Sequence, residues 1–162
     1  MATVAQQERA RTEARILIIG VGSAYRRDDA VGLIIAQRLR AKKLNHVQIR
    51  EESGEGTSLM ESWKDADTLI LIDAVHSGAA PGTLYRLNAH RQTIPTDFFH
   101  YSTHAFSVAE AIELARALNQ LPRRLIVHGI EGENFEMGEG LSPEVEKATE
   151  EALRLVLLDL RL

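Results

Sequence analysis

Residues 16–32, ILIIGVGSAYRRDDAVG, run from an apolar segment through a loop with two glycines into the start of a helix. The apolar segment is typical of a strand that is buried on both faces of a parallel sheet. Gly20 and Gly22 let the backbone turn sharply or come close to a ligand. The acidic pair Asp28-Asp29 then precedes apolar residues at helical spacing. In an open α/β sheet, ligands bind at the carboxyl ends of the strands, where this loop is expected to lie.

The rest of the chain continues the alternation of strands and helices. The later elements are expected in this order: a strand at residues 46–50, a short helix capped by Thr57 or Ser58 that runs through Trp63, strands at 68–73 and 83–87, a helix that opens with a Ser107–Glu110 capping box, a strand at 124–130, and a helix that opens at Ser142-Pro143. Turn residues at 77–82 predict that the strands on either side form a hairpin, with an antiparallel strand at the edge of the sheet. This alternation predicts an α/β fold with helices on both faces of a twisted, mostly parallel sheet.

Length and hydropathy bound the organisation of the chain. Its 162 residues predict one domain at residues 15–162, preceded by a polar extension at residues 1–14. The extension has no apolar core of the kind found in signal peptides. No apolar run reaches the ~18 residues of a membrane span. We therefore expect a cytoplasmic protein with no membrane partner, acting as a monomer.

Charge and composition exclude several kinds of chemistry. The formal net charge of −4 does not favour nucleic acid, whose binding calls for a basic patch. There is no cysteine, which excludes disulfides, thiol nucleophiles and thiolate ligands. The glycine loop lacks the third glycine of a dinucleotide fingerprint, because Tyr25 stands there, and no Walker sequence occurs. No nucleotide cofactor and no serine-hydrolase elbow are expected.

Three residues carry the candidate chemistry: Asp29, Asp73 and His104. Each has a structural alternative: Asp29 as a helix-terminal acid, Asp73 in a cap or an ion pair, His104 as a hydrogen-bonded loop residue. Both aspartates are expected at the carboxyl edge of inner strands, with the histidine on a loop that leads into the next helix. Two oxygen ligands and one imidazole would form an open site for a divalent transition metal. Spacing leaves His76 and His100 as rival imidazoles.

The combined motifs resemble the hydrogenase maturation endopeptidases, the family that trims the large subunit of nickel–iron hydrogenases. The similar segments are residues 20–32, residues 69–74 followed by 80–83, Ser102-Thr103-His104, and residues 141–143. Their order and spacing agree over roughly residues 15–160. Two departures stand out: Ser23 replaces the family's usual Asn, and the acidic residue before a Gly-Gly-Thr sequence is replaced by Gly54-Glu55-Gly56-Thr57.

The resemblance implies a fold, a site and a substrate. The fold would be a five-stranded twisted sheet between helices. The catalytic and metal-binding residues would be Asp29, Asp73 and His104, and the loop of Gly54, Gly56 and Thr57 would bind substrate. The substrate would be the large-subunit precursor, already carrying nickel, from which a short C-terminal extension is removed.

Our hypothesis is that nickel in the precursor completes its coordination with these three side chains. Asp28 is a candidate general base by adjacency alone. Two other functions remain open: a self-contained metal-dependent amidase or peptidase, and a non-catalytic chaperone that binds the precursor.

Overall fold

The computed structural model describes residues 1–6, 14–99 and 105–161. Its elements in chain order are β1 (Ile16–Val21), the 3-10 helix η1 (Arg27–Ala30), α2 (Val31–Ala41), β2 (Val47–Glu52), α3 (Gly56–Trp63), β3 (Thr68–Val75), β4 (Leu84–Asn88), α4 (Val108–Ala117), β5 (Arg124–Glu131) and α5 (Pro143–Asp159). No helix in the described part of the chain is long and apolar enough to cross a membrane.

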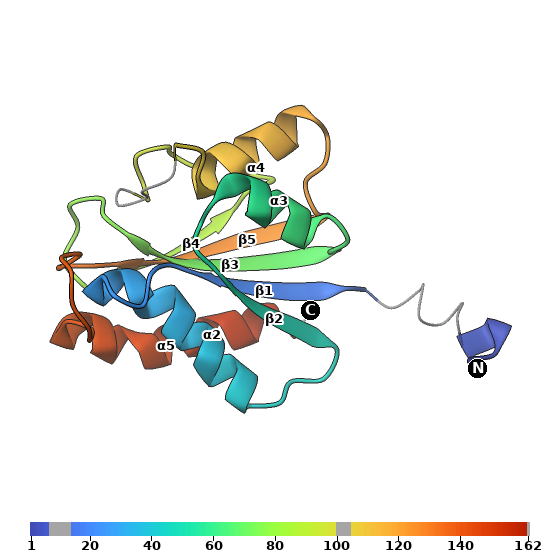
Figure 1. Ribbon diagram of the computed structural model, residues 1–162, viewed down its shortest axis with the longest axis horizontal. Helices are drawn as coiled ribbons and strands as arrows, with labels where there is room; N and C mark the ends of the chain where they lie inside the picture. The colour runs from blue at the N-terminus through green and yellow to red at the C-terminus, as the bar shows by residue number, and fades with distance from the viewer. Residues whose placement is uncertain (7–13, 100–104, 162) are drawn as a thin grey trace.

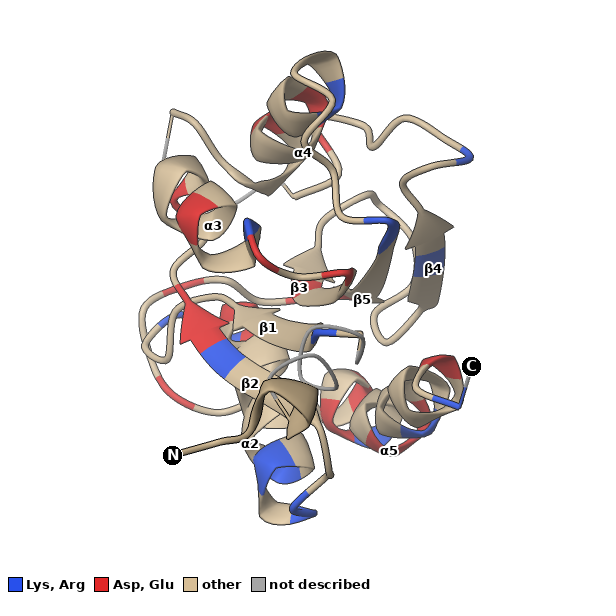
Figure 2. Ribbon diagram, turned by 90° about the vertical axis from the view of Figure 1, so that its right-hand side faces the viewer, with Lys and Arg blue, Asp and Glu red and all other residues tan. Residues whose placement is uncertain are grey.

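The strands form one five-stranded sheet in the order β2-β1-β3-β5-β4. The first four of these are parallel, and β4 pairs antiparallel with β5 at the edge. Helices α3 and α4 cover one face of the sheet, while α2 and α5 cover the other (Figures 1 and 2). The predicted three-layer α/β fold with one antiparallel edge strand is confirmed. That residues 15–162 act as a single domain after an extension at 1–14 stays a prediction.

The predicted hairpin between residues 68–73 and 83–87 is wrong. Both edges of β3 are occupied by parallel partners, β1 and β5, so β4 lies on the far side of β5. The connection passes the end of β5, where the N–H of Gly82 donates to the carbonyl of Glu131 (2.8 Å) and the N–H of Glu131 donates to the carbonyl of Thr83 (2.8 Å). Local turn chemistry predicts a reversal of the chain, but not which strand lies beside it afterwards.

Two of the predicted helix caps are also wrong in detail. The cap of α3 is Glu55, whose carboxylate accepts from the N–H groups of Thr57 (3.0 Å) and Ser58 (2.8 Å). At the start of α4, the Ser107 hydroxyl donates to the Glu110 carboxylate (2.5 Å) and makes no bond to a helix N–H. Helix α4 nevertheless begins directly after Ser107, as the sequence predicts, whereas α3 begins at Gly56, before both of its predicted caps.

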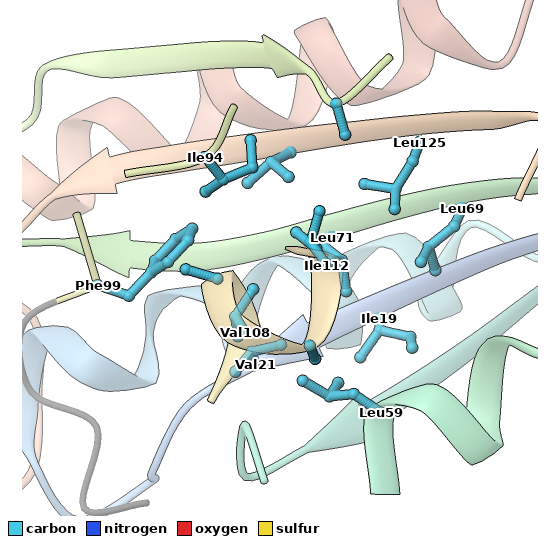
Figure 3. Packing of buried hydrophobic residues seen from close by; sticks show 14 of the residues in the cluster. Ile19, Val21, Leu59, Leu69, Leu71, Ile94, Phe99, Val108, Ile112 and Leu125 are labelled. Carbon is cyan, nitrogen blue, oxygen red and sulfur yellow. The ribbon is translucent and has the colours of Figure 1, made fainter. Parts of the chain in front are cut away.

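The core is divided by the sheet into two apolar clusters. One lies under α3 and α4 and takes Ile19 and Val21 from β1 and Leu69, Leu71 and Val75 from β3. The other lies under α2 and α5 and takes the alternate strand residues. Figure 3 shows the first cluster, in which the side chain of Val21 lies beside the start of α4. This alternation also decides which face each polar side chain of the strands reaches.

Close packing of α2 on the sheet depends on two glycines. A Cβ atom on Gly20 would lie 2.3 Å from the carbonyl oxygen of Gly32, and a Cβ on Gly32 would lie 2.3 Å from the carbonyl oxygen of Ile72 and 2.5 Å from that of Val21. These neighbours are backbone atoms of β1, β3 and α2, so they have little room to move. Gly20 and Gly32 therefore allow α2 to pack closely on the strands, and their closest neighbours belong to the protein itself rather than to a ligand.

We predict that Gly32→Ala destabilises the protein by about 2 kcal/mol or more, although alanine normally favours a helix over glycine by roughly 1 kcal/mol. Denaturant unfolding measures the loss. Gly78→Ala is the control, because a Cβ there meets nothing within 4 Å and only the positive φ of 88° is strained. A Gly32→Ala protein as stable as the native chain would show that α2 can shift away from the strands.

Candidate active site at the carboxyl edge of the sheet

The loops that follow β1, β3 and β5 gather at one end of the sheet, on the left of Figure 1. Asp73 lies near the end of β3 and is only 6% exposed. Leu71 and Val75, two residues on either side, belong to the cluster under α3 and α4, so alternation directs the Asp73 side chain to that same face. Its carboxylate accepts a hydrogen bond from the N–H of Ala74 (2.8 Å), the only bond it receives within the described residues.

Asp29 reaches the same edge from η1, which packs against β3. Its carboxylate accepts from the N–H of Ser23 at 2.9 Å. A Cβ on Gly22 would lie 1.9 Å from the carbonyl oxygen of Asp29, so the loop folds back tightly on itself. The glycine loop therefore positions the aspartate through backbone contacts.

The two carboxylates lie close enough to affect each other's charge. Burial raises the pKa of Asp73 well above the ordinary value of 3.8, and the negative charge of Asp29 raises it further. Burial also raises the pKa of Asp29, against the N–H of Ser23 and the positive charge of Arg26. Two poorly solvated acids with few donors are stabilised by a shared proton or by a cation. Shifted acids of this kind are typical of functional sites.

The predicted third ligand, His104, and its rival His100 lie outside the described residues. The other rival, His76, is described, and its ring meets the ring of Phe135 edge-on at 5.4 Å. Phe135 belongs to the cluster under α2 and α5, on the face opposite to Asp73. Within the described chain, no three acidic or histidine side chains form a metal-binding group. Among the described residues, His76 therefore does not form a three-ligand group with the two aspartates.

The predicted substrate loop covers Gly54, which lies between β2 and α3, and Gly56 and Thr57, which open α3. Gly54 has φ of 94° and faces the side chains of Val21 and Val108, while a Cβ on Gly56 would lie 2.4 Å from the ring of Phe106. Both glycines are buried, and Thr57 is exposed. The loop thus packs between the end of β1 and the start of α4, next to the face that holds Asp73. That it binds substrate stays a prediction.

Asp28, the residue before Asp29, has a structural role. It is fully buried, and its carboxylate accepts from the N–H groups of Glu133 (2.8 Å), Asn134 (2.9 Å) and Ser142 (2.7 Å) and from the Ser142 hydroxyl (2.7 Å). Burial opposes the charge, but these hydrogen bonds together lower the pKa. A carboxylate with four donors and a low pKa is a poor general base. It ties the loop before α5 to η1.

Two further charged residues at this edge were missed by the sequence analysis. Glu131 was not among the sequence candidates; it is 1% exposed, and its carboxylate accepts from the N–H groups of Ser77 (2.8 Å) and Gly78 (3.0 Å). Arg26 lies near Asp29 and lines a cavity of ≈ 670 Å³ together with His76 and Phe135. The burial of Glu131 was detectable from sequence, because Glu131 ends a strand whose other residues are mostly apolar, but its hydrogen-bond partners were not.

Comparison with known proteins decides the family. The HycI family model, which describes hydrogenase maturation proteases, matches residues 35–158, well over half of the chain. The chain belongs to this family. The hydrogenase 2 maturation protease of Escherichia coli K12 is 32% identical over 151 residues, 91% of each chain. HoxM of Azotobacter vinelandii, a hydrogenase expression/formation protein, is 30% identical over 149 residues, 90% of this chain and 72% of that protein.

Solved structures agree with this assignment. The hydrogenase maturating endopeptidase HybD from E. coli aligns with a TM-score of 0.74 at 30% identity, over 91% of this chain and 92% of that one. The resemblance found from the motifs is therefore confirmed, and the chain is a hydrogenase maturation protease.

Neutralising Asp28 should destabilise this protease, whereas neutralising the neighbouring Asp29 should not. We expect Asp28→Asn to lose about 3–5 kcal/mol of unfolding free energy at pH 7, because it breaks buried, charge-assisted bonds. The folded-state pKa of Asp28 is lowered, so this stabilisation is present above the ordinary value of 3.8 and is lost as pH falls below it. Asp29→Asn is the matched control and should lose none. Equal losses in denaturant titrations would contradict the anchoring role.

Asp73→Asn should make the protease more stable at alkaline pH. Because the folded pKa of Asp73 is raised, native stability falls as pH rises above 3.8, and the ionised form costs stability at pH 8. We expect a melting temperature about 2–4 °C higher at pH 8 for each ~1 kcal/mol regained, with the difference vanishing below pH ~4. Asp97→Asn, at an exposed site, should change nothing. A variant that melts lower at pH 8 would show that the charge is held by favourable contacts.

Proposed function

We propose that this protease removes the C-terminal extension of the nickel-loaded precursor of a nickel–iron hydrogenase large subunit. We further propose that Asp29, Asp73 and His104 recognise the nickel that the precursor carries. The observation that supports this most directly is the like-charge pair at the carboxyl edge, where each of the two carboxylates receives one N–H bond from the described residues. Such a pair is stabilised by a positive charge brought from outside.

The donor set fits a borderline divalent ion such as nickel. Carboxylate oxygens offset the charge of the ion, and an imidazole adds a nitrogen ligand that nickel accepts readily. Three protein ligands leave positions for ligands from the precursor. In this proposal the ion belongs to the substrate, so a precursor without nickel leaves the two acids facing each other uncompensated.

The raised pKa of Asp73 makes binding of the ion depend on pH. In the free protease, the pair retains a proton to higher pH than an ordinary carboxyl would. Binding to an ion requires both carboxylates in the charged form, so that proton is released on docking. Recognition should therefore weaken as pH falls. The bound ion would supply Lewis acidity, while Asp29 and Asp73 orient it at the end of the sheet.

The test is cleavage of purified precursor, followed by mass spectrometry, with nickel-loaded and nickel-free forms in parallel. We expect cleavage of the loaded form only. Loss of the partner of a metal ligand costs ~10–100-fold, so loss of a ligand itself in His104→Ala should cost at least ~100-fold. His46→Ala is the matched control, because that exposed residue lies before β2, at the opposite edge of the sheet. His100→Ala tests the remaining rival imidazole.

Three results would overturn the proposal. Equal cleavage of both precursor forms would end the nickel-recognition model. About one metal ion retained through purification would favour a self-contained metal amidase or peptidase. A stable complex with no change in precursor mass would favour a non-catalytic chaperone. A monomeric state and a cytoplasmic location stay predictions, which light scattering and cell fractionation would check.

A further inference from the structure

The most exposed large apolar side chains of the described chain beyond residue 14 lie at the edge that holds the two aspartates. Tyr25 is 64% exposed and Met137 is 70% exposed. A parallel bridge pairs Arg26 with Gly138, so the residues just before these, Tyr25 and Met137, are opposite each other in register. Residues 24–27 and 136–138, which we call the platform, thus present an aromatic ring and a thioether from adjacent segments.

The platform is held rigidly. The N–H of Gly138 donates to the carbonyl of Tyr25 (2.9 Å), and the N–H of Arg27 donates to the carbonyl of Gly138 (3.2 Å). Asp28, the residue after the first segment, accepts four hydrogen bonds from Glu133, Asn134 and Ser142, which lie on either side of the second segment. Arg27 adopts φ of 47°, an uncommon conformation for a residue with a side chain. Surfaces ordered in advance lose less entropy when a partner binds.

The platform is also continuous with the candidate site. Ser23, two residues before Tyr25, donates its N–H to Asp29, and Arg26 acts on the charge of the same carboxylate. A partner that reached the aspartate pair would therefore meet Tyr25 and Met137 beside it. Aromatic residues and methionine are enriched at protein interfaces.

We propose that the platform docks an apolar patch on the folded surface of the large-subunit precursor, next to its nickel centre. This inference rests on the proposed function, because it takes the precursor as the partner. In this arrangement the aspartates recognise the ion, and Tyr25 and Met137 recognise the protein around it. The platform contributes to binding and takes no part in the bond that is broken.

A second apolar surface is the rival. Leu114 and Leu118 of α4 are 42% and 53% exposed, and Leu114 lines a groove between α3 and α4. However, α4 begins at the carboxyl edge and Leu118 follows its last residue, so these leucines lie toward the opposite edge of the sheet. No described contact connects them to the aspartates. They therefore provide a matched control.

The test compares Tyr25→Ser/Met137→Ser with Leu114→Ser/Leu118→Ser on nickel-loaded precursor. We expect the platform variant to raise KM roughly 10-fold or more, with kcat within about twofold, because it removes binding that is equal in the ground state and the transition state. The α4 variant should leave both constants unchanged. Thermal unfolding checks that both variants fold, as expected for exposed positions.

Several results would overturn the inference. An unchanged KM for the platform variant, an equal rise for both variants, or a rise for the α4 variant alone would do so. A platform variant that only abolishes self-association, seen by light scattering, would make a second copy of this chain the occupant. If the wild-type protein does not cleave the precursor, the proposed function fails. The docking surface is then tested by itself, by comparing the Kd of the platform variant and of the α4 variant for the precursor.

Discussion

The close approach of α2 to the carboxyl ends of β1 and β3 is the constraint on which the site depends. Gly20 and Gly32 allow this approach, because a Cβ on either would overlap backbone atoms. Once the strand and the helix meet there, the residues between them must turn back within a short span. The turn takes the form of η1, and η1 carries Asp29 to the end of β3. A packing contact between backbones therefore brings two acids together against their mutual repulsion.

Asp28 and Asp29 show how neighbouring residues of one type divide structural and chemical roles. Asp28 points into the loop before α5 and is stabilised as an anion by four donors. Asp29 lies close enough to Asp73 to act on its charge, and burial destabilises Asp29 as an anion. The well-satisfied acid supports the poorly satisfied one, because it holds η1 in place. Strain of this kind persists only where the surrounding structure fixes it.

The fold class and the Asp29–Asp73 pair were predictable from sequence, because strand alternation and loop position act over short distances. The place of β4 was not, since it depends on which sheet edge is left unoccupied by β5, a distant segment. The sequence could also have predicted that the side chain of His76 points away from that of Asp73. His76 follows Asp73 by three residues in an extended segment, and an odd spacing puts two side chains on opposite faces. The roles of Asp28 and Glu131 depend on backbone donors from other loops, which sequence patterns do not encode.

In the proposed function, an incomplete ion site combined with a docking surface would explain how a small protease is selective. A complete set of ligands would bind free metal ions and could not distinguish a loaded precursor from an empty one. Two carboxylates that disfavour their own charge bind an ion only when other ligands come with it. Contact at the Tyr25–Met137 platform would make the ion contact intramolecular, so two individually weak interactions would reinforce each other. In the proposed function, selectivity thus comes from requiring both the surface and the ion of the precursor at once.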